Sequence, residues 1–429
     1  MGKSKVHIIY IVEDGVTSLT CGVGAIAHNF IMGFDKIINS FKNKYNFKLS
    51  IITIKLKPSF IGDRKDLLKI SNKICKSHNG KIYFIDSRLK PTDNYFNFGI
   101  WEKYNKQANK IIKDITDFKK EKTIIIYNDT IFGHIDIKQK NCFNVWIPHS
   151  LSESHKQSYV DNNKWLKWEK RAIDIINQNK NAYLGYISEN VKKILMQLFD
   201  IRESKMLAFK NGFYFLLFEK YKYSQEEIIK ELKKRGIPTD KKIIFSFNRA
   251  DEYKGLDTAL KIMVKIVMKY SDYHGVLVAS RFSKELIIDK IHDHLRKIVE
   301  PCKSRINLFL GYEFDLPKYL LRYKNTKILL NLPTKDFCPL VPFESELIGH
   351  NDLCIINSDI DCFSDMIKNN YNGFLYPVKT KKSFNVINRI IKLSEGKRKL
   401  IIKKGKLRTK KKINLIKNYK RTLKILLDK

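Results

Sequence analysis

The segment DFCPLVPFE at 336–344 holds the two acidic side chains with the most informative spacing, Asp336 and Glu344. A strand-like apolar run at 327–332 precedes it, and a helix-like apolar run beginning near Pro342 follows it. When a loop joins a strand to a following helix, the backbone N–H groups and the dipole at the beginning of that helix point to the same place. One carboxylate can then bind the hydroxyls of a sugar, and the other those of a ribose. Two acids at this spacing are also common in proteins without a shared function, one in a loop and the other at the N-terminus of a helix. The interpretation therefore depends on further residues.

Two cations, Arg249 and Lys254, follow the apolar run 243–247. A predicted helix comes directly after them, and Gly255 allows it to begin there. At the carboxyl end of a strand, such a pair can hold the two phosphates of a diphosphate leaving group. Stabilising the charge that develops there would be its catalytic contribution. Lysine is abundant in this chain, so the inference rests on the position of the pair and not on its spacing.

A glycine turn, Cys21-Gly22-Val23-Gly24, precedes a helix-like stretch. Two close glycines let a backbone pass near a ligand, and a helix start favours an anion. Ala27 stands where the third glycine of a GxGxxG dinucleotide motif would be. An ordinary strand-to-helix turn explains the segment equally well.

The segment Pro148-His149-Ser150 directly follows the strand-like run 143–147. A histidine at the carboxyl end of a strand can hydrogen-bond a sugar or shuttle a proton. A structural or surface histidine is the competing interpretation. Glu153, His155 and Glu169 lie nearby and are weaker candidates.

Strand-like and helix-like segments alternate along nearly the whole chain, which is typical of parallel sheets covered on both faces. The predicted strands are 6–12, 49–54, 81–85, 123–127, 143–147, 183–187, 243–247, 275–279, 306–310, 327–332 and 353–357. The predicted helices include 25–39, 63–77, 101–118, 164–179, 225–235, 255–270, 284–299, 315–323 and 342–349. The pattern weakens at 211–224. The sequence therefore predicts an α/β protein with two Rossmann-like, doubly wound domains, 1–215 and 225–395. A ligand crevice is expected between them, at the strand carboxyl ends.

Residues 396–429 hold 15 Lys or Arg and one acid, Asp428. Their apolar residues recur at roughly helical spacing, which predicts an amphipathic basic helix interrupted at Gly405. Such a helix can close the fold by packing on the body with a solvated basic face. The alternative is contact with an anionic membrane.

The chain of 429 residues has a net charge of +38. Nucleic acid, an anionic membrane surface or phosphorylated ligands would each suit this charge. Because the lysines are spread along the whole length, a general compositional bias explains most of it. The sequence contains no recognisable nucleic-acid motif, so we do not expect a nucleic-acid partner.

No apolar run reaches about 18 residues, so no membrane span is expected. The apolar run at the N-terminus meets Glu13 and Asp14 and reads as a first strand, not as a signal peptide. Seven cysteines without CxxC spacing predict a reduced, cytoplasmic chain without structural zinc. Peripheral association with a membrane stays open.

These elements together resemble a retaining GT-B glycosyltransferase of family GT4, the glycogen synthase-like and sucrose-phosphate synthase-like group of glycosyl transferases group 1. The segment NRADEYKGLDTAL at 248–260 resembles the family's Gly-Arg-…-Lys-Gly segment, and DFCPLVPFE resembles its Glu-x7-Glu signature. NSDIDCFSDMIKNNYNGFLYP at 357–377 matches the segment that follows. In the first half, CGVG resembles the family's Gly-Gly-Val loop, KNGF at 210–213 its Pro-Asn-Gly, and IPHS at 147–150 lies where many members carry an active-site histidine.

The departures from the family pattern concern the acidic segment. Asp336 stands where Glu is usual and is one methylene shorter. Pro339 stands where glycine is common and has no N–H to donate. Asp361 and Cys362 replace a common Gly-Gly. These differences imply an altered sugar preference or a weakened enzyme.

The resemblance implies transfer of a hexose-like sugar from a nucleotide-diphosphate donor, with UDP the default nucleotide. It also implies that the anomeric configuration is retained, by a front-face mechanism, and that no metal and no cofactor is needed. Arg249 and Lys254 would hold the diphosphate, and their charge can stand in for a divalent ion. The acceptor would be a glycan, a small molecule or a lipid-linked sugar.

The same resemblance assigns further donor contacts. Glu344 would bind the ribose, and Asp336 the hexose hydroxyls. The N–H groups of Leu340 and Val341 would lie near the sugar or the phosphates. His149 would contact the donor sugar, while Gly22 and Gly24 would leave room around it. The alternative is a non-catalytic protein that binds a nucleotide sugar without turnover.

Overall fold

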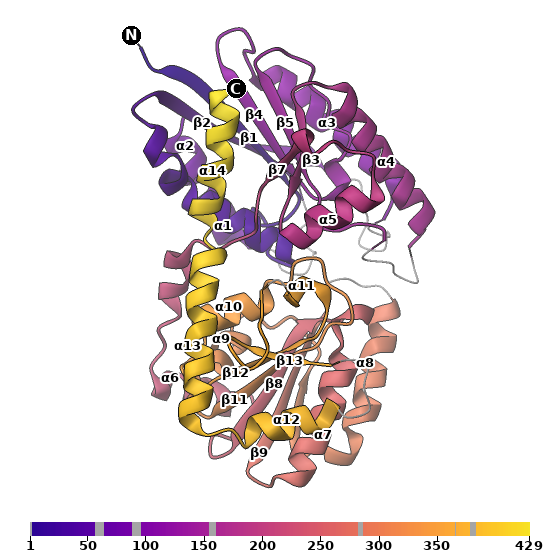
Figure 1. Ribbon diagram of the computed structural model, residues 1–429, viewed down its shortest axis with the longest axis vertical. Coiled ribbons are helices and arrows are strands. Elements are labelled where there is room, and N and C mark those ends of the chain that lie inside the picture. Colours follow the sequence, from indigo (N-terminus) through magenta and orange to yellow (C-terminus); the bar gives the residue numbers. More distant parts are fainter. Residues whose placement is uncertain are drawn as a thin grey trace. The chain divides into compact units, whose positions relative to one another are not determined.

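A computed structural model describes residues 2–55, 64–87, 96–153, 160–281, 286–364, 366–377 and 383–429 (Figure 1). The chain forms two compact units. Unit 1 contains Met1–Tyr214 and Ile413–Lys429, and unit 2 contains Phe215–Lys412. The predicted closing segment 396–429 is thus divided, with its first 17 residues in unit 2 and the rest in unit 1.

Unit 1 is built on a parallel sheet with strand order β3-β2-β1-β4-β5-β6-β7. The strands are β1 Ser4–Val12, β2 Tyr45–Lys55, β3 Ile82–Asp86, β4 Lys122–Asn128, β5 Cys142–Ile147, β6 Ala182–Tyr186 and β7 Met206–Ala208. The helices are α1 Gly22–Ile38, α2 Lys65–Ser77, α3 Phe98–Ile115, α4 Asn162–Gln178, α5 Glu189–Leu198 and α14 Leu415–Asp428.

Unit 2 repeats this plan, with parallel strands in the order β10-β9-β8-β11-β12-β13. The strands are β8 Lys242–Arg249, β9 Tyr273–Ser280, β10 Ile306–Phe309, β11 Thr326–Asn331, β12 Cys354–Ser358 and β13 Phe374–Tyr376. The helices are α6 Gln225–Lys234, α7 Leu256–Lys269, α8 Leu286–Val299, α9 Leu316–Arg322, α10 Val341–Ile348, α11 Asp361–Ser364, α12 Ser383–Ile391 and α13 Glu395–Lys412.

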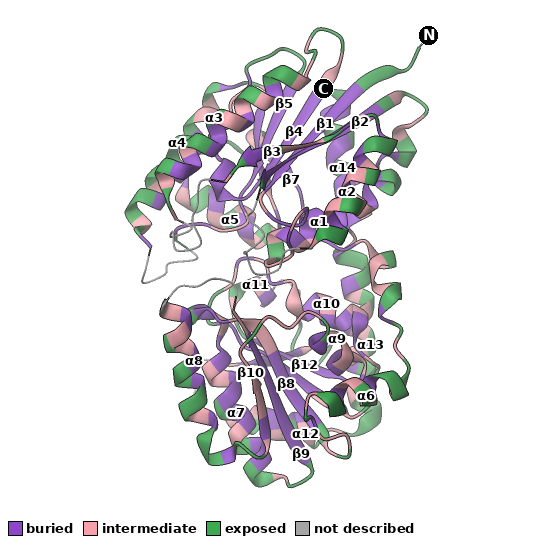
Figure 2. Ribbon diagram, turned by 180° about the vertical axis from the view of Figure 1, so that it is seen from behind, coloured by how far each residue is buried: buried purple, intermediate pink, exposed green. Residues whose placement is uncertain are grey.

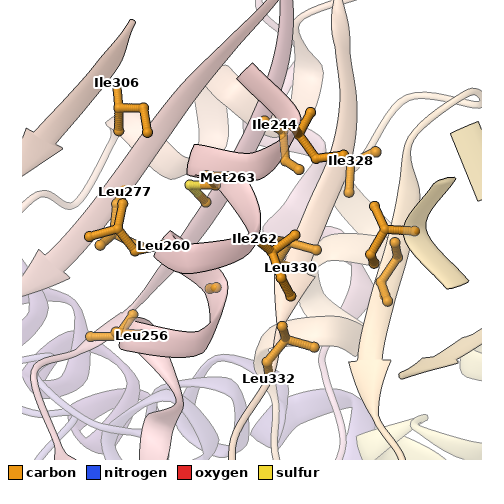
Figure 3. Close-up of a cluster of buried hydrophobic side chains, with 14 of the residues drawn as sticks. Ile244, Leu256, Leu260, Ile262, Met263, Leu277, Ile306, Ile328, Leu330 and Leu332 are labelled. Atoms are coloured by element: carbon orange, nitrogen blue, oxygen red, sulfur yellow. The ribbon is translucent and has the colours of Figure 1, made fainter. Parts of the chain in front are cut away.

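The strands of unit 2 are buried on both faces, as their apolar sequences require. On one face α7 packs its Leu256, Leu260 and Met263 against strand side chains such as Ile244 and Leu277 (Figure 3). On the other face, α6, α9 and α10 cover the neighbouring strand residues, among them Ile243, Phe245 and Val276. The sheets therefore lie inside the molecule, with exposure on the outer sides of the helices (Figure 2). The prediction of two doubly wound, Rossmann-like domains is confirmed.

The C-terminal segment differs from its predicted form. Helix α13 runs continuously through Gly405, and the break lies instead at Ile413–Asn414, where the Asn414 side chain caps α14. A Cβ on Gly405 would lie 2.8 Å from the Asn372 carbonyl oxygen. The glycine thus serves close packing and does not interrupt the helix. No helix in the described ranges has both the length and the apolarity that a membrane span needs.

A buried ion pair fixes α13 to α10. Arg408 Nη2 lies 2.7 Å from both carboxylate oxygens of Glu346, and the Thr409 hydroxyl donates to the same carboxylate. Arg408 Nη1 also donates to the carbonyl oxygen of Met366 at 2.8 Å. Burial raises the pKa of Glu346 although Arg408 opposes the shift. The arginine therefore compensates a carboxylate that is costly to bury.

Replacing Arg408 with methionine should lower the free energy of unfolding by about 3–5 kcal/mol, since the Glu346 charge then loses its buried partner. Urea unfolding followed by circular dichroism measures this change. The double variant E346M/R408M should be more stable than R408M, because it removes both charges. A single variant as stable as the wild type would contradict this role of the pair.

Candidate functional site

The strand order of unit 2 reverses between β8 and β11, where chain connections leave in opposite directions. At such a point in an open α/β sheet, the carboxyl ends of the strands flank a natural ligand crevice. Arg249 is the last residue of β8, and the loop that follows carries Lys254. Asp336 lies in the loop after β11. The topology therefore brings together three of the residues that the sequence singled out.

Lys254 and Asp336 form an ion pair between these two loops. The Lys254 ammonium donates to Asp336 Oδ2 at 2.7 Å, and their side chains are 15% and 9% exposed. Burial disfavours the charged ammonium, but Asp336 and Tyr253 together outweigh it, and the pKa of Lys254 is raised. Asp336 Oδ1 accepts a second bond from the Phe337 N–H at 2.8 Å. The Lys254 ammonium is thus held in its charged form, and the Asp336 side chain is held in place by two hydrogen bonds.

Gly255 allows the two loops to approach each other. Its φ is +63°, and an added Cβ would lie 1.8 Å from the Leu332 carbonyl oxygen. The Thr334 N–H also donates to the Tyr253 carbonyl oxygen at 2.8 Å. Since glycine alone tolerates this conformation and this contact, it sets the position of Lys254 against the Asp336 loop.

Arg249 has an acidic partner of its own. Its Nη2 lies 2.8 Å from Asp251 Oδ2 and donates to the Tyr253 hydroxyl at 3.2 Å. The Arg249 side chain is 31% exposed, whereas Asp251 is 5% exposed. The site thus combines two cations and two carboxylates, Arg249 with Asp251 and Lys254 with Asp336.

The N-terminus of α10 supplies the backbone donors expected after the acidic loop. Leu340 is the N-cap residue, no side chain caps this end, and Pro342 lies in the first turn. Glu344 is half-buried in the same turn. The free N–H groups and the helix dipole at such an end favour an anion. Leu340, Val341 and Glu344 therefore follow the same strand edge that carries Asp336.

Three asparagines form a polar row across the carboxyl ends of β8, β11 and β12 that the sequence reading missed. Asn331 Nδ2 donates to Asn357 Oδ1 at 3.0 Å, and Asn248 Nδ2 donates to Asn331 Oδ1 at 3.4 Å. Asn331 and Asn357 are buried. Their signal in the sequence is an Asn at the end of each of three apolar strands. The row fixes the strand ends from which the loops of the site begin.

In unit 1, His149 lies at the carboxyl edge of the sheet, after β5. Its Nε2 is 3.2 Å from Asn128 Oδ1, at the end of β4. Burial lowers the pKa of His149 to about 4, against the opposing charge of Asp129. The ring is therefore neutral near pH 7. A neutral imidazole suits hydrogen bonding better than supplying a proton.

Asp129 is a further residue of this edge that the sequence reading did not select. It is buried, has φ +72°, and accepts from Thr130 N at 2.7 Å and from the Ser150 hydroxyl at 3.3 Å. It lies two residues after the predicted strand 123–127, just as His149 lies two residues after the predicted strand 143–147. Of the weaker candidates, Glu169 is buried against Ser152, and burial raises its pKa to about 8. His155 lies outside the described residues.

The glycine turn of unit 1 is explained by packing within the unit. Gly22 begins α1 and is exposed. A Cβ on Gly24 would lie 2.3 Å from Asp14 Oδ2, so the Asp14 carboxylate already fills this space. Asp14 accepts bonds from the backbone of Gly15 and Cys21 at 2.9 Å each and thereby organises the turn. The room expected at Gly24 for a ligand is taken by the chain's own carboxylate.

The predicted residues therefore divide between the two units. Arg249, Lys254, Asp336, Leu340, Val341 and Glu344 share the carboxyl edge of the unit 2 sheet, whereas Gly22, Gly24 and His149 lie at that edge of unit 1. Within the described part of the chain, no three His, Cys, Asp or Glu side chains are grouped so that they could hold a metal ion. The positive charges at the site come from Arg249 and Lys254.

Comparison with known proteins places this geometry in context. Residues 227–408 match the family model described as Glycosyl transferases group 1, so unit 2 carries a domain of this kind. No curated protein matches the chain.

Solved structures similar to the chain include sucrose-phosphate synthase from Thermosynechococcus elongatus, at 14% identity and a TM-score of 0.71, covering 99% of each chain. Anabaena Alr3699/HepE in complex with UDP and glucose is 14% identical, with a TM-score of 0.65, covering 99% of this chain and 100% of that one. An Escherichia coli structure described as trehalose-6-phosphate bound with UDP-2-fluoro glucose is 12% identical, with a TM-score of 0.69, covering 98% of each. The chain has the GT-B fold.

Replacing Gly255 with alanine should lower the free energy of unfolding by at least about 1–2 kcal/mol, since a side chain in the left-handed region is strained and here also meets a carbonyl. Urea unfolding measures the effect. Gly396→Ala is the matched control, because nothing lies within 4 Å of its added Cβ. Equal stability of the two variants would show that the loops do not need this contact.

Proposed function

We propose that the chain is a retaining glycosyltransferase of the GT4 type. It moves a hexose-type sugar from a nucleotide-diphosphate donor, with UDP-sugars as the first candidates, to a hydroxyl acceptor. The observation that carries the proposal is the cation pair Arg249 and Lys254 at the strand-order reversal of a group 1 domain. The UDP and UDP-sugar in the similar solved structures support the choice of donor.

The charges of the site suit a diphosphate that gains charge as it leaves. Arg249 and Lys254 are close enough for the charge of Arg249 to disfavour that of Lys254. An anion bound between them relieves this repulsion. An ammonium has three N–H donors, so Lys254 can keep its bond to Asp336 and still donate to phosphate oxygens. Donors fixed before the reaction stabilise the departing diphosphate without reorganisation.

The remaining residues of the unit 2 edge take the donor contacts. Asp336 accepts hydrogen bonds from hexose hydroxyls, and Glu344 from the ribose. The N–H groups of Leu340 and Val341, at the start of α10, bind near the phosphates. Pro339 has no N–H, so this loop offers one backbone donor fewer than a glycine would provide.

In unit 1, neutral His149 contacts the donor sugar by hydrogen bonding. The pKa of about 4 argues against its use as a proton donor near pH 7. The acceptor oxygen forms its bond to the anomeric carbon on the face where the bond to the diphosphate breaks, so the anomeric configuration is retained. The departing phosphate oxygen accepts the proton of the acceptor hydroxyl. Arg249 and Lys254 supply the positive charge of a divalent ion, so no metal takes part.

The alternative is a protein that binds a nucleotide sugar without turnover. The pairing of the short Asp336 side chain with Lys254 favours this alternative, because an engaged carboxylate is less available to a hexose. The acceptor in the leading proposal is a glycan, a small molecule or a lipid-linked sugar.

An assay of UDP release tests the proposed reaction. The full chain incubated with UDP-sugars and a panel of hydroxyl acceptors should release UDP in the presence of EDTA and form a glycoside with the donor's anomeric configuration. Mass spectrometry and nuclear magnetic resonance identify the product. Donor affinity without UDP release would establish the binding protein instead, and loss of turnover in EDTA would overturn metal independence.

Replacing Arg249 with alanine should lower turnover by at least about tenfold, since a charge-assisted bond contributes roughly 1.5–3 kcal/mol. Arg296→Ala is the matched control, because Arg296 is an exposed arginine on α8 that is also paired with an aspartate, Asp293. Initial rates with the donor in excess measure the effect. A folded R249A variant with the turnover of R296A would remove Arg249 from the diphosphate site.

A further inference from the structure

Helix α13 exposes two large apolar side chains on its outer side. Leu400 is 52% exposed and Leu407 is 59% exposed. Seven residues make nearly two helical turns, so the two leucines lie on the same line along the helix. Both side chains therefore present more than half of their apolar surface to solvent.

Lysines lie on and beside this leucine line. By helix geometry Lys404 and Lys411 lie on the same stripe as the leucines, within about 60° of both, and Lys403 and Lys410 lie beside it, within about 80°. The chain has no Asp or Glu from 396 to 427. Glu395, at the start of the helix, pairs with Lys399. The outer side of α13 therefore carries two exposed leucines among lysines that lie on and beside the same stripe.

An exposed tyrosine extends this surface beyond the helix. Tyr371, in the turn before β13, is 51% exposed. The Lys404 ammonium lies 3.9 Å from its ring centroid, and that of Lys368 lies 5.6 Å away. An aromatic ring with a polar tip, surrounded by cations, suits the boundary between water and lipid headgroups.

The inner side of α13 holds this surface in place. Ile401, Gly405 and Thr409 are buried, and Arg408 pairs with Glu346 on α10. The helix runs beside α10 along unit 2 (Figure 1). The exposed leucines and lysines are therefore presented by a helix that is already folded, without a further cost of ordering the backbone.

We propose that the outer side of α13, with Tyr371, docks on a membrane surface rich in anionic phospholipids. Leu400, Leu407 and the Tyr371 ring enter the boundary between headgroups and acyl chains, and the lysines contact the anionic headgroups. A polyanion such as nucleic acid would use the lysines but would leave the leucine line in water. The combination therefore favours a lipid surface.

This surface belongs to unit 2 alone and is distinct from the residues at the carboxyl edge of its sheet. Binding to membranes is measured without nucleotide sugar or acceptor. Membrane docking can therefore be refuted while the transfer reaction is supported, and the transfer reaction can be refuted while membrane docking is supported.

Co-sedimentation of the full chain with phospholipid vesicles tests the proposal. The wild type should bind vesicles of phosphatidylcholine and phosphatidylserine and not vesicles of phosphatidylcholine alone. The double variant L400S/L407S should bind at least about tenfold more weakly, since each leucine loses its burial in lipid. Met268→Ser is the matched control, because Met268 is 68% exposed on another helix, α7, and it should bind as the wild type does.

A lysine pair provides the second arm. The variant K403A/K411A should lose roughly twenty-five-fold in affinity, at about fivefold for each lysine near an anionic surface. K290A/K297A removes the same charge from α8 and should have a smaller effect. Circular dichroism confirms that each variant is folded.

Two outcomes would overturn the proposal. Wild-type protein that does not bind anionic vesicles would refute the membrane partner. Equal vesicle binding by L400S/L407S and the wild type would show that charge alone acts, and matching affinities of the two for duplex DNA would then identify a polyanion surface.

Discussion

The ion pair between Lys254 and Asp336 is the interaction on which the site in unit 2 depends. It joins the loop after β8 to the loop after β11, on the two sides of the point where the strand order reverses. A buried pair gains little net stability by itself, because both charges must leave water. It persists here because Gly255 lets the two backbones meet and because the Asp336 carboxylate has a second donor, the Phe337 N–H. The role of the pair is to fix the positions of the Lys254 ammonium and the Asp336 carboxylate.

Helix α10 connects this site to the rest of unit 2. Its first turn presents backbone donors and Glu344 at the strand edge, while Glu346, half a turn further on, is held by Arg408 of α13. The two glutamates are two residues apart on a short helix, so they lie on different sides of it and have different roles. Glu344 is partly exposed, whereas Glu346 anchors the helix from a buried position. The exposed outer side of α13 is thus backed by the same contact that steadies the site.

The elements of the fold were predictable where a strand is long and buried on both faces, because such strands read as continuous apolar runs. The strands β7 and β13 were missed, since three residues give no such run. The sequence placed Arg249, Lys254 and Asp336 after strands, but it contains nothing that states the strand order, and only that order makes Lys254 and Asp336 neighbours. Gly24 shows a further limit. The sequence does not reveal that the Asp14 carboxylate, ten residues earlier, fills the space beside this glycine, and a donor-binding role for Gly24 stays a prediction.

The route of the chain bears on how the protein is made. Helix α14 belongs to unit 1, where the Tyr419 ring centroid lies 5.2 Å from that of Phe30 and 5.3 Å from that of Phe209. In the sequence, all of unit 2 comes between α14 and the rest of unit 1. During synthesis the ribosome therefore finishes the second unit before it delivers the last piece of the first. The earlier half must wait with an apolar surface around Phe30 uncovered, and a nascent chain in that state is a natural client for chaperones.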